Sequence, residues 1–112
     1  MPVIDQATFE ELKQMSGEDF INELIDTFLE DAPKMIAEIQ SALSANNADA
    51  FRRAAHSMKS NASTFGATEL AALAKELEML GKENKLADSG DKLKALEEAY
   101  ASVREELKRL KS

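Results

Sequence analysis

Residues 51–67 have the sequence FRRAAHSMKSNASTFGA. Apolar side chains recur in it every three or four positions, as on one face of an α-helix; they are Phe51, Ala54, Ala55, Met58, Ala62 and Phe65. At 100° per residue, all six lie within about 60° of Phe51 on a helical wheel. Gly66 follows where a glycine commonly ends a helix, and Asn47 precedes the pattern as a candidate N-cap. This stretch therefore predicts an amphipathic helix.

A longer helical pattern precedes it, from about residue 18 to residue 45. The apolar residues keep their helical phase on both sides of Pro33, which predicts one kinked helix rather than two helices. Upstream, residues 5–15 predict a short helix. Ser16 and Asp19 predict a capping box that opens the long helix.

Two more helices follow the central one. From Thr68, leucines recur at heptad spacing, and Gly81 is expected to close that helix. The polar stretch 82–91 predicts a loop, and residues 91–110 predict the last helix. Four long amphipathic helices with short connections predict an all-α fold, an antiparallel up-down four-helix bundle with a short extra N-terminal helix. We expect one domain over residues 1–112.

The composition excludes several classes of protein. The chain has 112 residues, no cysteine and a net charge of −7. Without cysteine there is neither a disulfide nor a thiolate metal site, which fits the cytoplasmic location that we expect. The negative charge argues against nucleic-acid binding. No apolar run approaches the roughly 18 residues of a membrane span, and the first residues lack the features of a secretory signal.

His56 is the single histidine of the chain, and it lies about 140° from Phe51 on the wheel. It is therefore expected to face solvent. Its neighbours on that side are three cations and two serines, namely Arg52, Arg53, Lys59, Ser60 and Ser63. Positive charges nearby disfavour a further positive charge on the imidazole and would stabilise an anion attached to it. A neutral ring among cations is the environment that a phosphoryl acceptor needs.

Other interpretations of the histidine have less support. An ordinary surface histidine beside basic residues remains an alternative. A metal site has no second histidine and no cysteine, and Arg53 occupies the position where a Glu-x-x-His pair needs an acid. Nothing supports a Ser-His-Asp hydrolase. No glycine-rich nucleotide loop occurs, so we expect neither ATP binding nor a cofactor.

The stretch AAHSMKSNASTFGA, residues 54–67, resembles the signature of histidine-containing phosphotransfer (HPt) domains. His56 matches the phosphorylated histidine of that family and Lys59 matches the lysine that contacts the phosphoryl group. Met58 matches the buried apolar position, and Phe65 and Gly66 match the helix end. The segments 20–43 and 70–82 also resemble the helices before and after the signature, so the resemblance covers roughly residues 5–110.

The resemblance implies a phosphorelay carrier rather than an autonomous enzyme. A receiver-domain phosphoaspartate would give its phosphoryl group to Nε2 of His56, and a second receiver aspartate would take it. The implied partners are response-regulator receiver domains and a hybrid sensor histidine kinase, with magnesium on the receiver and the chain itself a monomer. Ser60 departs from the family, which usually has glycine there, and Asn61 replaces the usual serine.

Two other functions remain open from the residues alone. One is a receiver-binding adaptor that carries no phosphate, and the other is a generic helical-bundle interaction domain. A start at Met1 favours a stand-alone protein over a piece of a hybrid kinase.

The long helix also has an apolar arc of about 180°, wider than the roughly 100° that a bundle helix needs. Either the short first helix covers the excess, through Phe9, Leu12 and Met15, or some of it stays exposed beside His56 as an apolar docking patch, at Ile21, Ile25 or Leu29.

Overall fold

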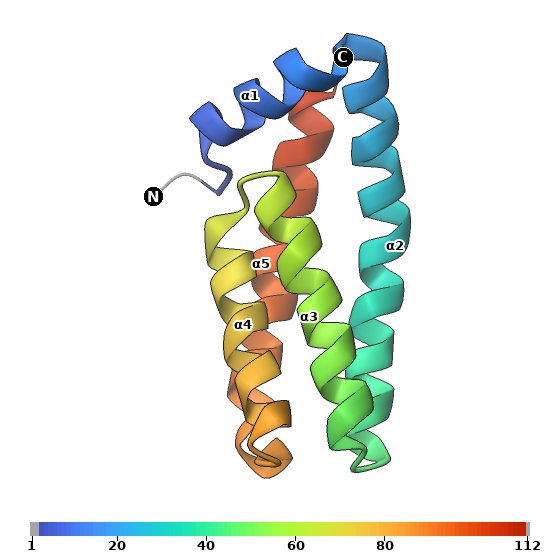
Figure 1. The fold of residues 1–112 in the computed structure, drawn as a ribbon, viewed down its shortest axis with the longest axis vertical. Coiled ribbons are helices and arrows are strands. Elements are labelled where there is room, and N and C mark those ends of the chain that lie inside the picture. Colours follow the sequence, from blue (N-terminus) through green and yellow to red (C-terminus); the bar gives the residue numbers. More distant parts are fainter. Residues whose placement is uncertain (1–2, 112) are drawn as a thin grey trace.

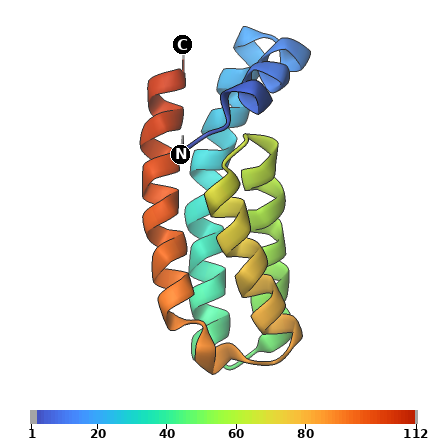
Figure 2. The ribbon, with the colours of Figure 1, turned by 90° about the vertical axis from the view of Figure 1, so that its left-hand side faces the viewer.

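The structure of the protein, a computed structural model, describes residues 3–111. These residues form five α-helices and one turn of 3₁₀-helix, with the bounds α1 Gln6–Ser16, α2 Glu18–Ser44, α3 Ala48–Thr64, α4 Thr68–Lys82, η1 Leu86–Asp88 and α5 Gly90–Leu110. The helices α2 to α5 run alternately up and down, and α1 lies across one end of the bundle (Figures 1 and 2). The expected bundle with a short extra N-terminal helix is confirmed. Within the described residues, no helix is both long and apolar enough to cross a membrane.

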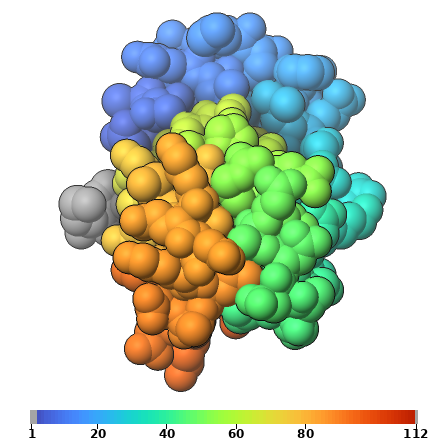
Figure 3. Space-filling view, turned by 60° about the horizontal axis from the view of Figure 1, so that its bottom comes forward, coloured from blue at the N-terminus to red at the C-terminus, as the bar shows by residue number. Residues whose placement is uncertain are grey.

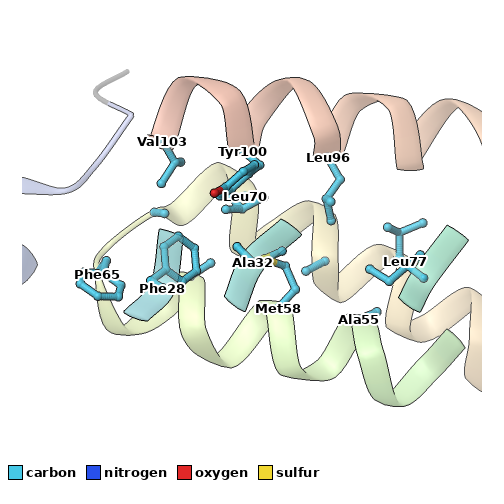
Figure 4. Packing of buried hydrophobic residues seen from close by; sticks show 14 of the residues in the cluster. Phe28, Ala32, Ala55, Met58, Phe65, Leu70, Leu77, Leu96, Tyr100 and Val103 are labelled. Carbon is cyan, nitrogen blue, oxygen red and sulfur yellow. The ribbon is translucent and has the colours of Figure 1, made fainter. Parts of the chain in front are cut away.

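Apolar side chains from all five α-helices fill the interior of the bundle. Phe28 of α2 packs on Phe65 and on Tyr100 of α5, with ring centroids 5.2 Å and 6.0 Å apart (Figure 4). The whole predicted apolar face of α3 is buried. Burial of each large side chain stabilises the fold by about 1.5–3 kcal/mol, so this packing fixes the rotation of α3 about its axis.

Three helices end on a residue with a left-handed backbone, a conformation that satisfies the last carbonyl groups of a helix. Gly66 ends α3 with φ 78°, Asn46 ends α2 with φ 54° and Asn84 ends α4 with φ 56°. At the first of these, the N–H of Gly66 donates to the carbonyl of Ser63 at 3.1 Å. At the other end of α3, the side chain of Asn47 caps the helix. Both predicted ends of α3 are confirmed.

Gly81 does not close α4, and that prediction was wrong. The helix continues to Lys82, and Gly81 lies buried where α4 passes α3. A Cβ at this position would lie 3.0 Å from the backbone nitrogen of Arg52. The glycine therefore allows the two helices to approach closely rather than ending one of them.

The start of α2 also differs from the prediction. Ser16 is the last residue of α1, and its hydroxyl donates to the carbonyl of Leu12 at 2.6 Å instead of capping α2, whose N-cap is Gly17. A serine can take this acceptor one turn back whenever it lies inside a helix. The helix α2 itself continues through Pro33, which confirms a single helix.

The polar stretch 82–91 is only partly a loop. It contains η1, whose Leu86 is buried in the core. The buried hydroxyl of Ser89 donates to the carbonyl of Leu86 at 2.6 Å and holds this turn closed. Leu86 is the single large apolar residue among these ten, so the stretch has no helical periodicity and the sequence pattern missed η1.

Candidate functional site

His56 lies on the outward side of α3, and 54% of its side chain is exposed. Ala55 and Met58, which belong to the apolar face of the helix, are fully buried. Because their packing fixes the rotation of α3, it also holds the imidazole at the surface. The predicted solvent-facing orientation is confirmed.

A carboxylate from α4 contacts both the histidine and the lysine of the signature. Oε2 of Glu78 lies 2.7 Å from Nδ1 of His56, and Oε1 of Glu78 lies 2.7 Å from Nζ of Lys59. Only 16% of the Glu78 side chain is exposed, so water screens these contacts less than it would at an open surface. The three residues form the His56–Lys59–Glu78 site, which joins α3 to α4.

Sequence reasoning missed Glu78, which is 22 residues from His56 and outside the signature. One signal for it exists in the pattern of α4. Glu78 lies about 80° from Leu70 on the helical wheel, at the edge of the apolar face. Ala74 and Gly81 lie closer to the centre of that face. A carboxylate at such an edge is placed to reach a neighbouring helix.

The contacts of Glu78 determine which nitrogen of the histidine is free. The hydrogen bond from Lys59, and to a smaller extent that from His56, holds the pKa of Glu78 below its usual value despite partial burial. The group is therefore a carboxylate at neutral pH and can only accept hydrogen bonds. Nδ1 of His56 must donate in this contact. A neutral imidazole with its proton on Nδ1 keeps its lone pair on Nε2, which makes Nε2 the nucleophilic atom.

The three cations expected around His56 do not stand alone, because each of them binds a carboxylate. Arg52 and Arg53 both bind Asp49, with Nη2 to Oδ1 at 3.0 Å and Nε to Oδ2 at 3.2 Å. The hydrogen bond from Arg52 and the charge of Arg53 hold the pKa of Asp49 below its usual value. Positions three and four apart on a helix are neighbours, which lets one carboxylate serve both arginines. Each of the three cations thus has a carboxylate partner.

The two serines predicted at the site lie exposed on the same helix. The carbonyl of Ser60 accepts a hydrogen bond from the Thr64 hydroxyl at 3.1 Å. Ser63 lines an open hollow of about 310 Å³ together with Lys59 and with Lys75 of α4. Figure 3 shows α3, in green, and α4, in yellow to orange, side by side on this face. The surface next to the site therefore carries two ammonium groups.

The predicted apolar docking patch on α2 is not at the surface. Ile21 and Ile25 are 2% and 0% exposed, and both belong to the core. The helix α1 covers this part of α2, and its Phe9 is buried as well. Met15 of α1 takes no part in this covering, because it is 86% exposed. The alternative in which the arc is covered holds for Ile21 and Ile25, whereas Phe20 at the edge of the arc is 51% exposed.

Residues 23–106 match a family model described as the Hpt domain. Among solved structures, the chain is similar to the crystal structure of histidine-containing phosphotransfer protein B (HptB) from Pseudomonas aeruginosa PAO1. The two are 30% identical in sequence with a TM-score of 0.93, and the match covers 98% of this chain and 95% of that chain. No curated protein sequence matches the chain significantly.

Proposed function

The chain belongs to the Hpt domain family, whose members are the histidine carriers of phosphorelays, and from this premise we propose that His56 carries the phosphoryl group on Nε2. The observation that supports this most directly is the contact between Nδ1 and Glu78 at 2.7 Å. It holds the ring proton on one nitrogen and leaves the lone pair on the other, at the end of a side chain that is half exposed.

The transfer is a displacement at phosphorus. The lone pair of Nε2 forms the N–P bond while the bond from phosphorus to the aspartate oxygen of a receiver domain breaks. The electron pair of that bond stays on the aspartate, which becomes a carboxylate again. The ring keeps its Nδ1 proton and gains a positive charge, which the adjacent Glu78 carboxylate stabilises. A second receiver aspartate reverses these steps to take the group.

Lys59 is the proposed stabiliser of the phosphoryl group, since its ammonium is one turn along α3 from His56. Arg52, Arg53, Ser60 and Ser63 surround His56 on the outward side of the helix, and we assign them to the rim that contacts the receiver. Ser60 stands where the family usually has glycine, and its small side chain keeps the approach to the ring open. Lys59→Ala is expected to slow transfer with little change in melting temperature, because it removes no core volume.

The proposed partners are the receiver domains of response regulators and of a hybrid sensor histidine kinase, and the proposed location is the cytoplasm. The domain acts as a monomeric carrier and not as a kinase, because its sequence has no glycine-rich loop to hold ATP. The receiver supplies the magnesium and most of the catalysis.

The proposal is tested by incubating the purified protein with a receiver domain labelled on its aspartate. Label is expected on the protein and not on a His56→Gln variant, and none is expected from ATP and magnesium alone. The adduct should survive base and hydrolyse in acid, as a phosphoramidate does. Label on the His56→Gln variant, or autophosphorylation by ATP, contradicts the assignment.

The same experiment separates the carrier from the two other functions. A receiver-binding adaptor would form a complex with the receiver without gaining label. A generic helical bundle would do neither. Binding is measured in parallel with an unlabelled receiver, so that a loss of transfer can be distinguished from a loss of docking.

A further inference from the structure

Glu78 divides its two oxygens between the residue that is to be phosphorylated and the residue that is to hold the phosphate. One oxygen accepts from His56 and the other binds the ammonium of Lys59, each at 2.7 Å. Before phosphorylation the ammonium of Lys59 and the carboxylate of Glu78 form one ion pair, so one positive charge meets one negative charge.

Phosphorylation upsets that balance. When Nε2 forms its bond to phosphorus and the receiver aspartate leaves with the electron pair, the ring carries a positive charge and the new group carries two negative charges. This group sits on the same ring that Glu78 contacts. The phosphoryl group and Glu78 then carry three negative charges together, against the two positive charges of the ring and of Lys59. Arg52 and Arg53 do not relieve the shortage directly, because both are bound to Asp49.

We propose that Glu78 competes with the phosphoryl group for Lys59 and thereby keeps the phosphohistidine short-lived and easily transferred. This inference rests on the proposed function of His56. Glu78 thus has two opposing effects. It orients the ring so that the histidine accepts the group, and it prevents Lys59 from binding the group so tightly that it cannot move on. The low pKa of Glu78 keeps the carboxylate charged, and therefore competing, at neutral pH.

The charge of Glu78 can be removed without removing its hydrogen bond to the ring. In Glu78→Gln the amide oxygen still accepts from Nδ1, but Lys59 is free to bind the phosphoryl group. We expect the half-life of phosphorylated His56 to increase about two- to fivefold, the range of effect that partly exposed ion pairs reach.

Glu76→Gln is the matched control. It makes the same change of charge on the same helix, but Glu76 binds Lys92 at 3.3 Å and belongs to no part of the site. Its phosphohistidine should decay at the wild-type rate. Should the Glu78→Gln variant fail to fold, Glu78→Ala also frees Lys59 and is expected to lengthen the half-life, while it slows acceptance because the ring loses its orienting partner.

A double-mutant cycle with Lys59→Ala identifies the route of the effect. If Glu78 acts by competing for Lys59, Glu78→Gln lengthens the half-life far less in a Lys59→Ala background than in the wild-type background. A half-life that stays at the wild-type value in Glu78→Gln overturns the inference, and so does a full effect that persists without Lys59. Failure of the proposed function is recognised separately, since then the wild-type protein takes no label or His56→Gln does.

Discussion

The two faces of α3 meet opposite requirements within a helix of 17 residues. On the inward face, Phe51 and Met58 are fully buried among apolar neighbours from other helices. On the outward face, His56 and Lys59 reach one carboxylate on α4 and keep much of their surface in water. The inward face contributes packing, and the outward face contributes charge and the proposed nucleophile.

Stability and chemistry therefore depend on different residues of the same helix. The inward face fixes where the outward face points, because the rotation of the helix is set by packing. Substitutions on the outward face can therefore change the chemistry while the fold persists. The following predictions test that separation, in order of the expected change in the free energy of unfolding.

Phe51→Ala should have the largest effect. Its aromatic side chain is fully buried, and such truncations cost about 3–5 kcal/mol through lost burial and a remaining cavity. Urea unfolding measures the loss, with Ser57→Ala on the exposed side of α3 as the control. A cost below about 1 kcal/mol would mean that the inward face does not determine stability.

Gly81→Ala should have an intermediate effect on the free energy of unfolding, and it should also change the chemistry on the outward face of α3. A Cβ at this position lies 3.0–3.1 Å from backbone atoms of Arg52, so α3 and α4 must separate slightly. We expect a loss of about 1–2 kcal/mol, because overpacking outweighs the better helix propensity of alanine. The phosphoryl transfer rate should fall too, since His56 and Glu78 lie on the two separated helices. Gly90→Ala has no atom within 4 Å of the new Cβ and should show neither loss.

Tyr100→Phe should raise stability by about 1 kcal/mol, because the buried hydroxyl of Tyr100 has no hydrogen-bond partner among the described residues. Burial raises the pKa of Tyr100 above its usual value. Because the pKa is higher in the folded state, the neutral phenol adds to the free energy of unfolding below about pH 10. This contribution to stability is lost as the pH rises through the folded-state pKa. Alkaline unfolding should therefore begin at a higher pH in the variant. An equal or lower onset contradicts the buried, neutral phenol.

His56→Gln should have the smallest effect on the free energy of unfolding, within about 0.5 kcal/mol, because the side chain is half exposed and lies outside the buried core. Thermal unfolding followed by circular dichroism measures it. A large loss of stability would mean that the outward face supports the fold, and the separation of the two faces would not hold.

Much of the fold follows from local pattern. Spacings of three and four residues placed the helices within a few residues of their ends, and the same periodicity put His56 on the outward side of α3. Gly66 was predictable because a glycine directly after an apolar pattern ends many helices. These features depend on residues that are near one another in the chain.

The errors arise where distant segments meet. Gly81 looks like a helix end in the sequence, and only the approach of α3 shows that it is a contact point. Ile21 and Ile25 are buried because other helices pack against α2, which α2 alone cannot reveal. Glu78 reaches His56 only because α4 packs on α3. Helical periodicity determines which way a side chain points, but not which helix lies opposite.

The hydrogen bond between His56 and Glu78 joins two helices. The reactivity of the histidine therefore depends on how often α3 and α4 move apart. A transient opening that moves α4 away from α3 would take the proton acceptor from the ring while the rest of the bundle stays folded. During such an opening the imidazole could place its proton on either nitrogen. Hydrogen-exchange protection of the α4 amides would then measure how much of the time the carrier is ready to accept.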